Sequence, residues 1–82
     1  MSTTSATEFR EIPVEARHLL TVASGVEATT ARREAADLEN AVRRLLGSLI
    51  DFGTDGSTAY LCEFALETAC ALREAADQGE RS

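Results

Sequence analysis

The chain has 82 residues, a formal net charge of −6 and few aromatic side chains, three phenylalanines and one tyrosine. A chain of this size forms one domain that buries only about 60 to 65% of its unfolded surface, so we expect a thin core and a need for further burial by self-association. Its eight arginines are outnumbered by fourteen acidic residues, which argues against a protein that holds nucleic acid through a basic face.

The beginning of the chain shows no apolar periodicity, and we expect residues 1–12 to form a flexible arm. This segment also lacks the basic and then apolar order of a signal peptide, and no stretch of the chain approaches the roughly 20 apolar residues of a membrane span. A cytoplasmic location is therefore the default expectation. Residues 13–78 are expected to form a single helical domain, and residues 79–82 a flexible tail.

Residues 13–26 carry conflicting signals. Pro13 could open a helix, whereas residues 20–22, which precede Gly25, are equally typical of a short strand followed by a turn. The sequence leaves both alternatives open, and it predicts only that this segment does not extend the long helix that follows.

Two stretches of small or apolar residues, spaced alternately three and four apart, predict helices over about residues 28–52 and 58–77. The turn between them offers Ser57 as the N-cap of the second helix, which is expected to stop before Gly79. If the chain reverses at this turn, the stretches pair antiparallel, and most layers set a large residue against a small one. The layers are Phe52 with Thr58, Leu49 with Cys62, Leu45 with Ala65, Val42 with Ala69, Leu38 with Leu72, and Ala35 with Ala76. The predicted fold class is mainly α, a long antiparallel helical hairpin preceded by a short extended or helical segment.

Near the turn both predicted helices are apolar beyond these layers, and a single hairpin cannot bury all of the surplus. An exposed apolar patch of several hundred square ångströms usually marks an interface. The N-terminal segment could reach it only with residues near Phe9, Ile12 and Val14, and a second copy supplies the missing layer more simply, giving a homodimeric four-helix bundle. The candidate interface residues are Leu46, Ile50, Tyr60, Leu61, Phe64 and Leu66.

Three acidic residues of the second helix, Glu63, Glu67 and Glu74, fall within a narrow arc. The plainest interpretation is a solvated face, and the alternative is an acidic docking face for a partner that carries arginine. No spacing indicates a catalytic triad, a phosphate-binding loop or a zinc site around His18, so we expect no enzyme, no metal and no cofactor.

The two cysteines are expected to be reduced thiols. Cys62 occupies a layer position and is expected to be buried, whereas Cys70 lies toward the polar edge of the same helix. Eight residues on one helix separate them by about 12 Å along its axis, which is too far for a disulfide between them.

From His18 onward the chain resembles a family of small uncharacterised proteins of pseudomonads and related proteobacteria. The resemblance rests on the apolar run that leads into Gly25 and Val26, and on one set of small or apolar positions in each of the two expected helices. These sets are Ala31, Ala35, Leu38, Leu45 and Leu46, and Leu61, Leu66, Ala69, Ala71 and Leu72. Members often have proline where this chain has Ser24. The resemblance implies a helical hairpin behind a short strand, in a dimer, and it brings no catalytic residue.

The functional expectation is a small regulatory module that is homodimeric and binds another protein through an apolar helical surface with acidic flanks. A transcription regulator is the candidate partner, by analogy with a small helical anti-activator of pseudomonads. The alternative is a structural or assembly component that only self-associates. Nucleic-acid binding is a distant third, because it would need a basic stripe of Arg32, Arg33, Arg43 and Arg44 that acidic and neutral residues interrupt.

Overall fold

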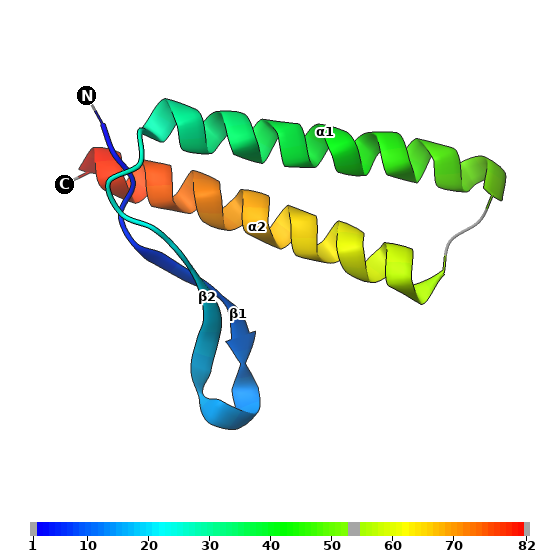
Figure 1. Ribbon diagram of the computed structural model, residues 1–82, viewed down its shortest axis with the longest axis horizontal. Coiled ribbons are helices and arrows are strands. Elements are labelled where there is room, and N and C mark those ends of the chain that lie inside the picture. The colour runs from blue at the N-terminus through cyan, green and yellow to red at the C-terminus, as the bar shows by residue number, and fades with distance from the viewer. Residues whose placement is uncertain (1, 53–54, 82) are drawn as a thin grey trace.

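The computed structural model describes residues 2–52 and 55–81, with the side chains of these residues apart from 49–52. The elements follow in the order strand β1 (Thr7–Ile12), a 3-10 turn η1 (Pro13–Glu15), strand β2 (Arg17–Val22), helix α1 (Ala28–Phe52) and helix α2 (Gly56–Arg81). The two helices run antiparallel side by side, and the two strands form a ribbon that passes α2 and projects beyond it (Figure 1). The helical hairpin predicted from the sequence is confirmed, and the fold is mainly α.

α1 occupies the residues expected of it, whereas both ends of α2 differ from the prediction. Asp55 rather than Ser57 caps α2, because its Oδ1 accepts the backbone N–H of Thr58 at 2.8 Å. At the other end α2 continues through Gly79 to Arg81, within the segment expected to be a flexible tail. Gly79 does not end the helix. The backbone of Thr3 crosses the helix at this point, and a Cβ on Gly79 would lie 1.6 Å from the Thr3 carbonyl oxygen. Glycine is therefore needed here for close approach.

Of the flexible arm expected over residues 1–12, residues 2–12 form hydrogen-bonded backbone, which includes β1. Residues 2–5 run beside the connection that enters α1, where the N–H of Thr4 donates to the carbonyl of Val26 at 2.7 Å. The N–H of Ala28, the first residue of α1, donates to the carbonyl of Ser2 at 2.9 Å, so the arm also satisfies a helix terminus. The prediction was wrong because it looked for apolar periodicity, whereas backbone hydrogen bonds hold this segment.

The ribbon resolves the alternatives left open for residues 13–26 in favour of a strand. β1 and β2 pair antiparallel, from Thr7 opposite Val22 to Ile12 opposite Arg17. Pro13 opens the 3-10 turn between them rather than a longer helix, and Ala16 closes that turn with a positive φ of 54°. The single domain therefore begins with a β-ribbon, which the sequence prediction placed partly inside the arm.

The core consists of small residues. Ala28, Ala31 and Ala76 form one buried cluster between the helices, and Val22 packs with Ala71 and Ala75 where the ribbon meets α2. Among the described residues no large side chain is completely buried. The predicted layers are confirmed where alanine lets the helices approach closely, at Ala35, Val42, Ala69 and Ala76, all buried.

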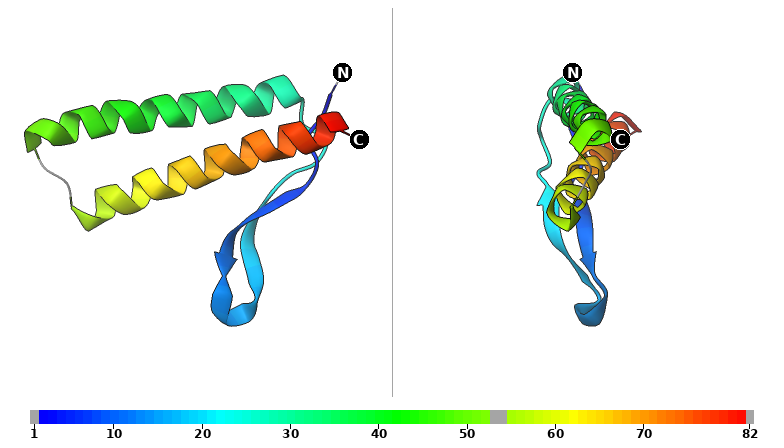
Figure 2. Two further views of the ribbon diagram at one scale, coloured as in Figure 1. Left: turned by 180° about the vertical axis from the view of Figure 1, so that it is seen from behind. Right: turned by 90° about the vertical axis from the view of Figure 1, so that its right-hand side faces the viewer.

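Toward the turn the helices diverge, as Figures 1 and 2 show, and the layers open. Leu45, a layer residue, is 40% exposed. Its expected neighbours Leu49 and Phe52 lie outside the described side chains. The molecule measures 45 × 33 × 14 Å, so its shortest dimension is close to the diameter of one helix. The end view in Figure 2 shows both helices and the ribbon within this single layer.

Candidate protein-interaction surface

The candidate interface residues divide between two opposite faces of the helical hairpin. Leu46 lies seven residues after Glu39 and Leu66 seven residues before Arg73, so each leucine shares a helix face with one of these charged residues. Glu39 and Arg73 join the two helices through a bidentate ion pair, with nitrogen to oxygen distances of 2.6 and 3.1 Å. Leu46 and Leu66 are thus exposed on a side of the hairpin that charged contacts dominate. We call this side the ion-pair face.

The remaining candidates lie on the other side, which also carries the ribbon. Phe64 lies seven residues before Ala71, and Ala71 packs against Val22 of β2. Tyr60 and Leu61, which are 55% and 61% exposed, continue this side of α2 toward the turn. The side chain of Ile50, the sixth candidate, lies outside the described residues.

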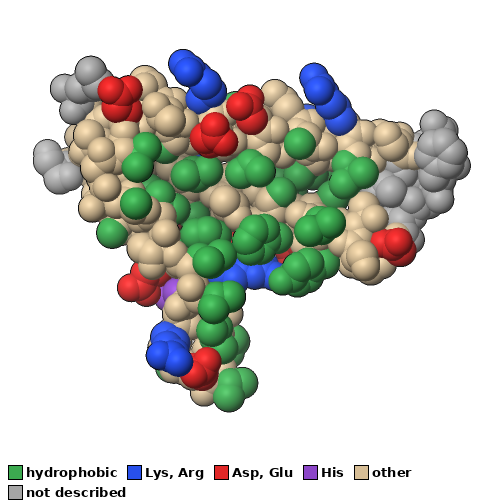
Figure 3. All heavy atoms as spheres, viewed as in Figure 1, with side chains coloured by type: hydrophobic (Ala, Val, Ile, Leu, Met, Phe, Trp, Pro, Cys, Tyr) green, Lys and Arg blue, Asp and Glu red, His purple; other side chains and the backbone are tan. Residues whose placement is uncertain are grey.

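A shallow apolar groove runs between the diverging helices on this second side. It has a volume of about 180 Å³, and it is lined by Ala41, Val42, Leu45, Leu61, Cys62 and Ala65. We define the groove face as Ala41, Leu45, Leu61 and Ala65 together with Tyr60 and Phe64. Figure 3 shows apolar side chains following the junction of α1 and α2 and continuing onto the ribbon, with acidic and basic side chains mostly at the rim.

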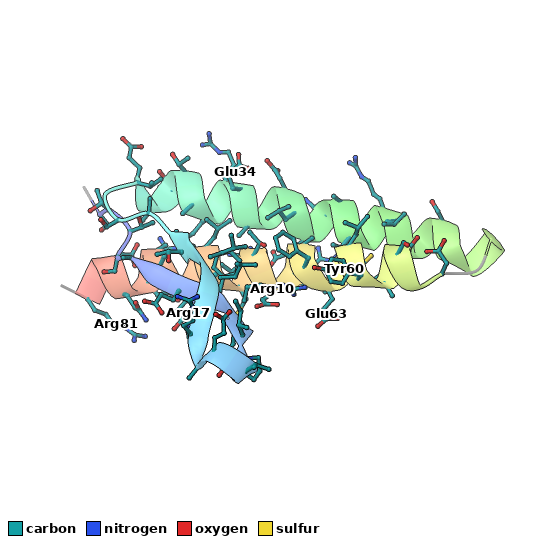
Figure 4. The ribbon with its side chains drawn as sticks, turned by 60° about the horizontal axis from the view of Figure 1, so that its bottom comes forward. Arg10, Arg17, Glu34, Tyr60, Glu63 and Arg81 are labelled. Carbon is teal, nitrogen blue, oxygen red and sulfur yellow. The ribbon has the colours of Figure 1, made fainter. Side chains whose placement is uncertain are left out.

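Arg10 of β1 fastens the ribbon to the edge of the groove face (Figure 4). Its backbone N–H donates to Glu67 Oε1 at 2.9 Å, and its guanidinium donates to Glu67 Oε2 at 2.8 Å. The same guanidinium lies 5.0 Å from the ring centres of both Tyr60 and Phe64, within the range of a cation–π contact. These contacts cover part of the two aromatic rings and leave Leu61 open.

The backbone at Arg10 adopts an unusual conformation for this purpose. Its φ of 63° lies in the left-handed region, which costs a residue other than glycine on the order of 1 kcal/mol. Hydrogen bonding to Glu67 raises the pKa of Arg10, and Tyr60 contributes in the same direction to a smaller extent. The guanidinium therefore stays charged. Sequence reasoning missed Arg10, because a lone arginine in a segment without apolar periodicity gives no signal of a turned backbone.

The three acidic candidates do not form one free docking face. Glu67 is occupied by Arg10, so the arginine-bearing partner of this carboxylate belongs to the same chain. Glu74 accepts a hydrogen bond from Gln78 Nε2 at 3.1 Å, and Glu63 is exposed on the outer side of α2. Of the three, Glu63 and Glu74 are exposed to solvent.

The predictions about the remaining chemistry-bearing residues can be placed on the structure. Cys62 is buried, as predicted, and Cys70 is exposed; both are free thiols. His18 Nδ1 lies 3.0 Å from Glu8 Oε2 on the ribbon surface. Within residues 2–52 and 55–81, no three His, Cys, Asp or Glu side chains gather as metal ligands would, and neither long helix is apolar enough over a sufficient length to cross a membrane.

Comparisons of the chain with protein-family models, with curated proteins and with solved structures find no significant match. The family resemblance stays an expectation from the sequence, and function must be argued from the surface itself.

Proposed function

We propose that this chain is a small regulatory protein-interaction module that binds another protein through the groove face. The observation that carries the proposal is the open apolar groove on a molecule only one layer thick. Protein domains usually bury the apolar face of one layer against a second layer. Here the second layer is missing over the half of the hairpin nearest the turn, where Leu45, Tyr60 and Leu61 remain exposed.

The surface area supports a missing partner. The chain exposes 5663 Å², whereas a compact monomer of its mass of 8.8 kDa is expected to expose about 4,800 Å². The excess is roughly 900 Å², close to the roughly 800 Å² that each partner contributes to a standard protein interface. The radius of gyration agrees, at 14.5 Å against about 12 Å for a compact chain of this length.

A helix is the partner element that the groove fits best. An amphipathic helix buries its apolar stripe when it packs into the depression between two others, and small side chains such as Ala41 and Ala65 let it approach closely. The net charge of −6 favours a partner with basic residues flanking its apolar stripe. As part of the same proposal the module acts as a homodimer, and a transcription regulator is the partner class that we favour by analogy.

Two neighbouring leucines on α1 give a matched test. Leu45 and Leu46 are similarly exposed, at 40% and 49%, but they lie on the groove face and the ion-pair face respectively. The same comparison can be made on α2 with Leu61 and Leu66. The chain is immobilised in four variants, Leu45→Asp, Leu46→Asp, Leu61→Asp and Leu66→Asp, and used to capture proteins from its native host.

A captured protein supports the proposal if it is retained by wild type and by the two ion-pair-face variants, and lost from both groove-face variants. Equal retention by all variants, or loss from the ion-pair-face variants only, contradicts it. Circular dichroism of each variant checks that the helices remain folded.

The rival function is a structural component that only self-associates, since a second copy could also cover an apolar layer. It predicts that no heterologous protein depends on Leu45 or Leu61, while the groove-face variants lose self-association.

A further inference from the structure

We propose that α2 carries a binding site for a guanidinium group, which Arg10 occupies in the free chain and an arginine of the bound partner takes over. The guanidinium site consists of Tyr60, Phe64 and Glu67. The inference rests on the proposed function, because it names a side chain through which a partner in the groove also engages α2. It follows from the contacts of Arg10 and from the way the ribbon is attached.

All three residues of the guanidinium site belong to α2. Tyr60 and Phe64 are four positions apart and Glu67 follows three positions later, so one side of the helix holds them together independently of the ribbon. A planar guanidinium stacks on aromatic faces and donates its N–H groups to a carboxylate. A lysine ammonium group has no plane to stack, so the site should prefer arginine to lysine.

Arg10 shows how a guanidinium lies in this site. Its central carbon is 5.0 Å from the centre of each aromatic ring, and its Nη1 donates to Glu67 Oε2 at 2.8 Å. The other carboxylate oxygen, Oε1, accepts the backbone N–H of Arg10. The ion pair is not sealed from solvent, since the side chains of Arg10 and Glu67 are 19% and 34% exposed. An arginine from another chain can therefore reach the carboxylate.

The backbone at Arg10 favours release of this side chain. Among the described residues other than glycine, only Arg10 and Ala16 have a positive φ, and such strain is typical of ligand clamps and switch segments. The strand register is also interrupted here. Residues 9 and 11 pair with residues 20 and 18, whereas the register contains no pair for Arg10. Moving Arg10 out of the site therefore relieves strain and breaks no strand pair.

The ribbon stays attached to α2 when Arg10 leaves. Phe9 and Val22 pack into the buried cluster that contains Ala75 of α2. Beyond Arg10 the ribbon projects away from the helix (Figure 1), and within the described chain no hydrogen bond or ion pair joins residues 11–20 to α2. Exchange of the guanidinium is therefore a local change at one edge of the ribbon.

The guanidinium site borders the groove. Tyr60 precedes Leu61 and Phe64 precedes Ala65, and both Leu61 and Ala65 line the groove. A helix bound in the groove holds its flanking residues beside the site. The partner's arginine is then tethered near the site as Arg10 is, so the two compete at similar effective concentrations. The net charge of −6 favours a cation that comes from another chain.

The variant Arg10→Gly empties the site in the full chain. Glycine adopts a positive φ without strain and keeps the N–H that donates to Glu67. Ala16→Gly is the matched control, because it places glycine at the other positive φ of the ribbon and leaves Arg10 in the site. Arg10→Gly combined with Glu67→Gln removes the carboxylate charge from the emptied site. Circular dichroism and the amide signals of Ala71 and Ala75 check that the fold and the ribbon contact persist. Arg10→Asn, which also tolerates a positive φ, replaces Arg10→Gly if glycine loosens the ribbon.

The probes are N-acetyl-arginine amide and, as its control, N-acetyl-lysine amide, followed by the amide signals of Tyr60 and Phe64. We expect Arg10→Gly to bind the arginine compound with a dissociation constant of about 10 mM or below, and 50 mM of it to raise the Tm by about 5 °C. Wild type, Ala16→Gly and the double variant should bind it at least about tenfold more weakly. Arg10→Gly should bind the lysine compound at least about threefold more weakly than the arginine compound.

A protein captured through the groove tests the exchange itself. Because Arg10 must leave before the partner's arginine enters, Arg10→Gly should bind that protein at least about threefold more tightly than wild type does. Adding Glu67→Gln to this variant should remove the gain.

An emptied site that does not bind the arginine compound, or binds both compounds equally, overturns the inference. If a captured protein depends on Leu45 and Leu61 but binds wild type and Arg10→Gly equally, the exchange is overturned and the proposed function stands. If Arg10→Gly binds the arginine compound but no protein depends on Leu45 and Leu61, the proposed function falls and the exchange with it, while the guanidinium site stands.

Discussion

Replacing Gly79 by alanine should destabilise the protein, although alanine is the better helix former. In an open helix the exchange gains about 1 kcal/mol. At Gly79, however, the new Cβ would lie 1.6 Å from the carbonyl oxygen of Thr3, and this separation must grow to at least 3.0 Å. The obstacle is backbone, so no side-chain rotation relieves it, and the N-terminal segment must move away from α2.

The cost of that movement can be worked from the bonds of Thr4, the next residue. Its backbone N–H and hydroxyl donate to the carbonyls of Val26 and Ala23, both at 2.7 Å. Its carbonyl and hydroxyl oxygens accept the N–H groups of Gly25 and Val26, at 3.0 and 3.1 Å. At about 1 kcal/mol net for each hydrogen bond, losing most of them costs about 3 to 4 kcal/mol. After the gain in helix propensity, the free energy of unfolding should fall by about 2 to 3 kcal/mol and the Tm by about 10 to 20 °C.

Gly47 provides the matched control. It lies within α1, and a Cβ added there meets no atom within 4 Å. Gly47→Ala should therefore raise the free energy of unfolding by about 1 kcal/mol. Thermal and urea unfolding followed by circular dichroism measure both variants. In a chain without residues 2–4 the clash disappears, and Gly79→Ala should stabilise as Gly47→Ala does. If Gly79→Ala stabilises the intact chain, the close crossing of Thr3 over α2 is refuted.

Three further predictions concern the ion-pair face, the core and the thiols. Hydrogen bonds from Arg73 and Arg32 lower the pKa values of Glu39 and Glu80 below their usual 4.5, so both carboxylates stabilise the fold above that pH, and their contribution is lost as the pH falls through the lowered values. Glu39→Gln should thus lower the free energy of unfolding at neutral pH and make it fall less steeply as the pH is lowered. If urea unfolding shows the same pH dependence for this variant as for wild type, the prediction is contradicted. Val22→Ala should lower the free energy of unfolding by about 2 kcal/mol, because it leaves a cavity against Ala71 and Ala75; a loss below about 0.5 kcal/mol would show that the ribbon is not packed on α2. A maleimide reagent followed by mass spectrometry should modify Cys70 in the native protein and Cys62 only after unfolding, and rapid native labelling of Cys62 would show that the helices separate near the turn.

The helical hairpin could be predicted from the sequence because its signal is local. The alternating spacing of three and four marks the buried side of each helix, and Ala35, Val42, Ala69 and Ala76 are buried as that spacing indicates. The same pattern predicts that the two helices lie equally close to each other along the whole hairpin. It does not show that alanine at one end and leucine at the other make the helices diverge, and this divergence creates the groove.

The N-terminal ribbon could not be predicted in the same way, because its position depends on contacts between the two ends of the chain. Only Phe9 and Val22 bring apolar side chains from the ribbon into the buried cluster, and backbone hydrogen bonds supply the rest of the attachment. Gly79 shows the limit most clearly. In the sequence it is typical of a helix end, and only the position of Thr3, 76 residues earlier, shows that it serves a close crossing.

The sequence identified the apolar residues of the candidate interface but not the side of the hairpin on which each one lies, for a related reason. Counting apolar residues near the turn finds Leu46, Leu61 and Leu66 alike, but only the contacts of neighbouring residues show which side of the hairpin each one occupies. Arg10 gave no signal at all, although it holds the ribbon at the edge of the groove face.

The contact between the two ends of the chain also determines the order in which the protein can be assembled. The Thr7 Oγ1 lies 3.4 Å from Oε1 of Gln78, which is 71 residues later in the chain. The N–H of Ser5 donates to the carbonyl of Ala75, so it has no partner until α2 is made. On the ribosome the ribbon is made before its docking site on α2. The two helices can fold on each other through contacts that are nearer in sequence, and the ribbon must then attach as the final step. Until α2 has been made, the N–H of Arg10 in β1 lacks its helical partner, so the newly made chain is most exposed to pairing with a neighbour over that interval.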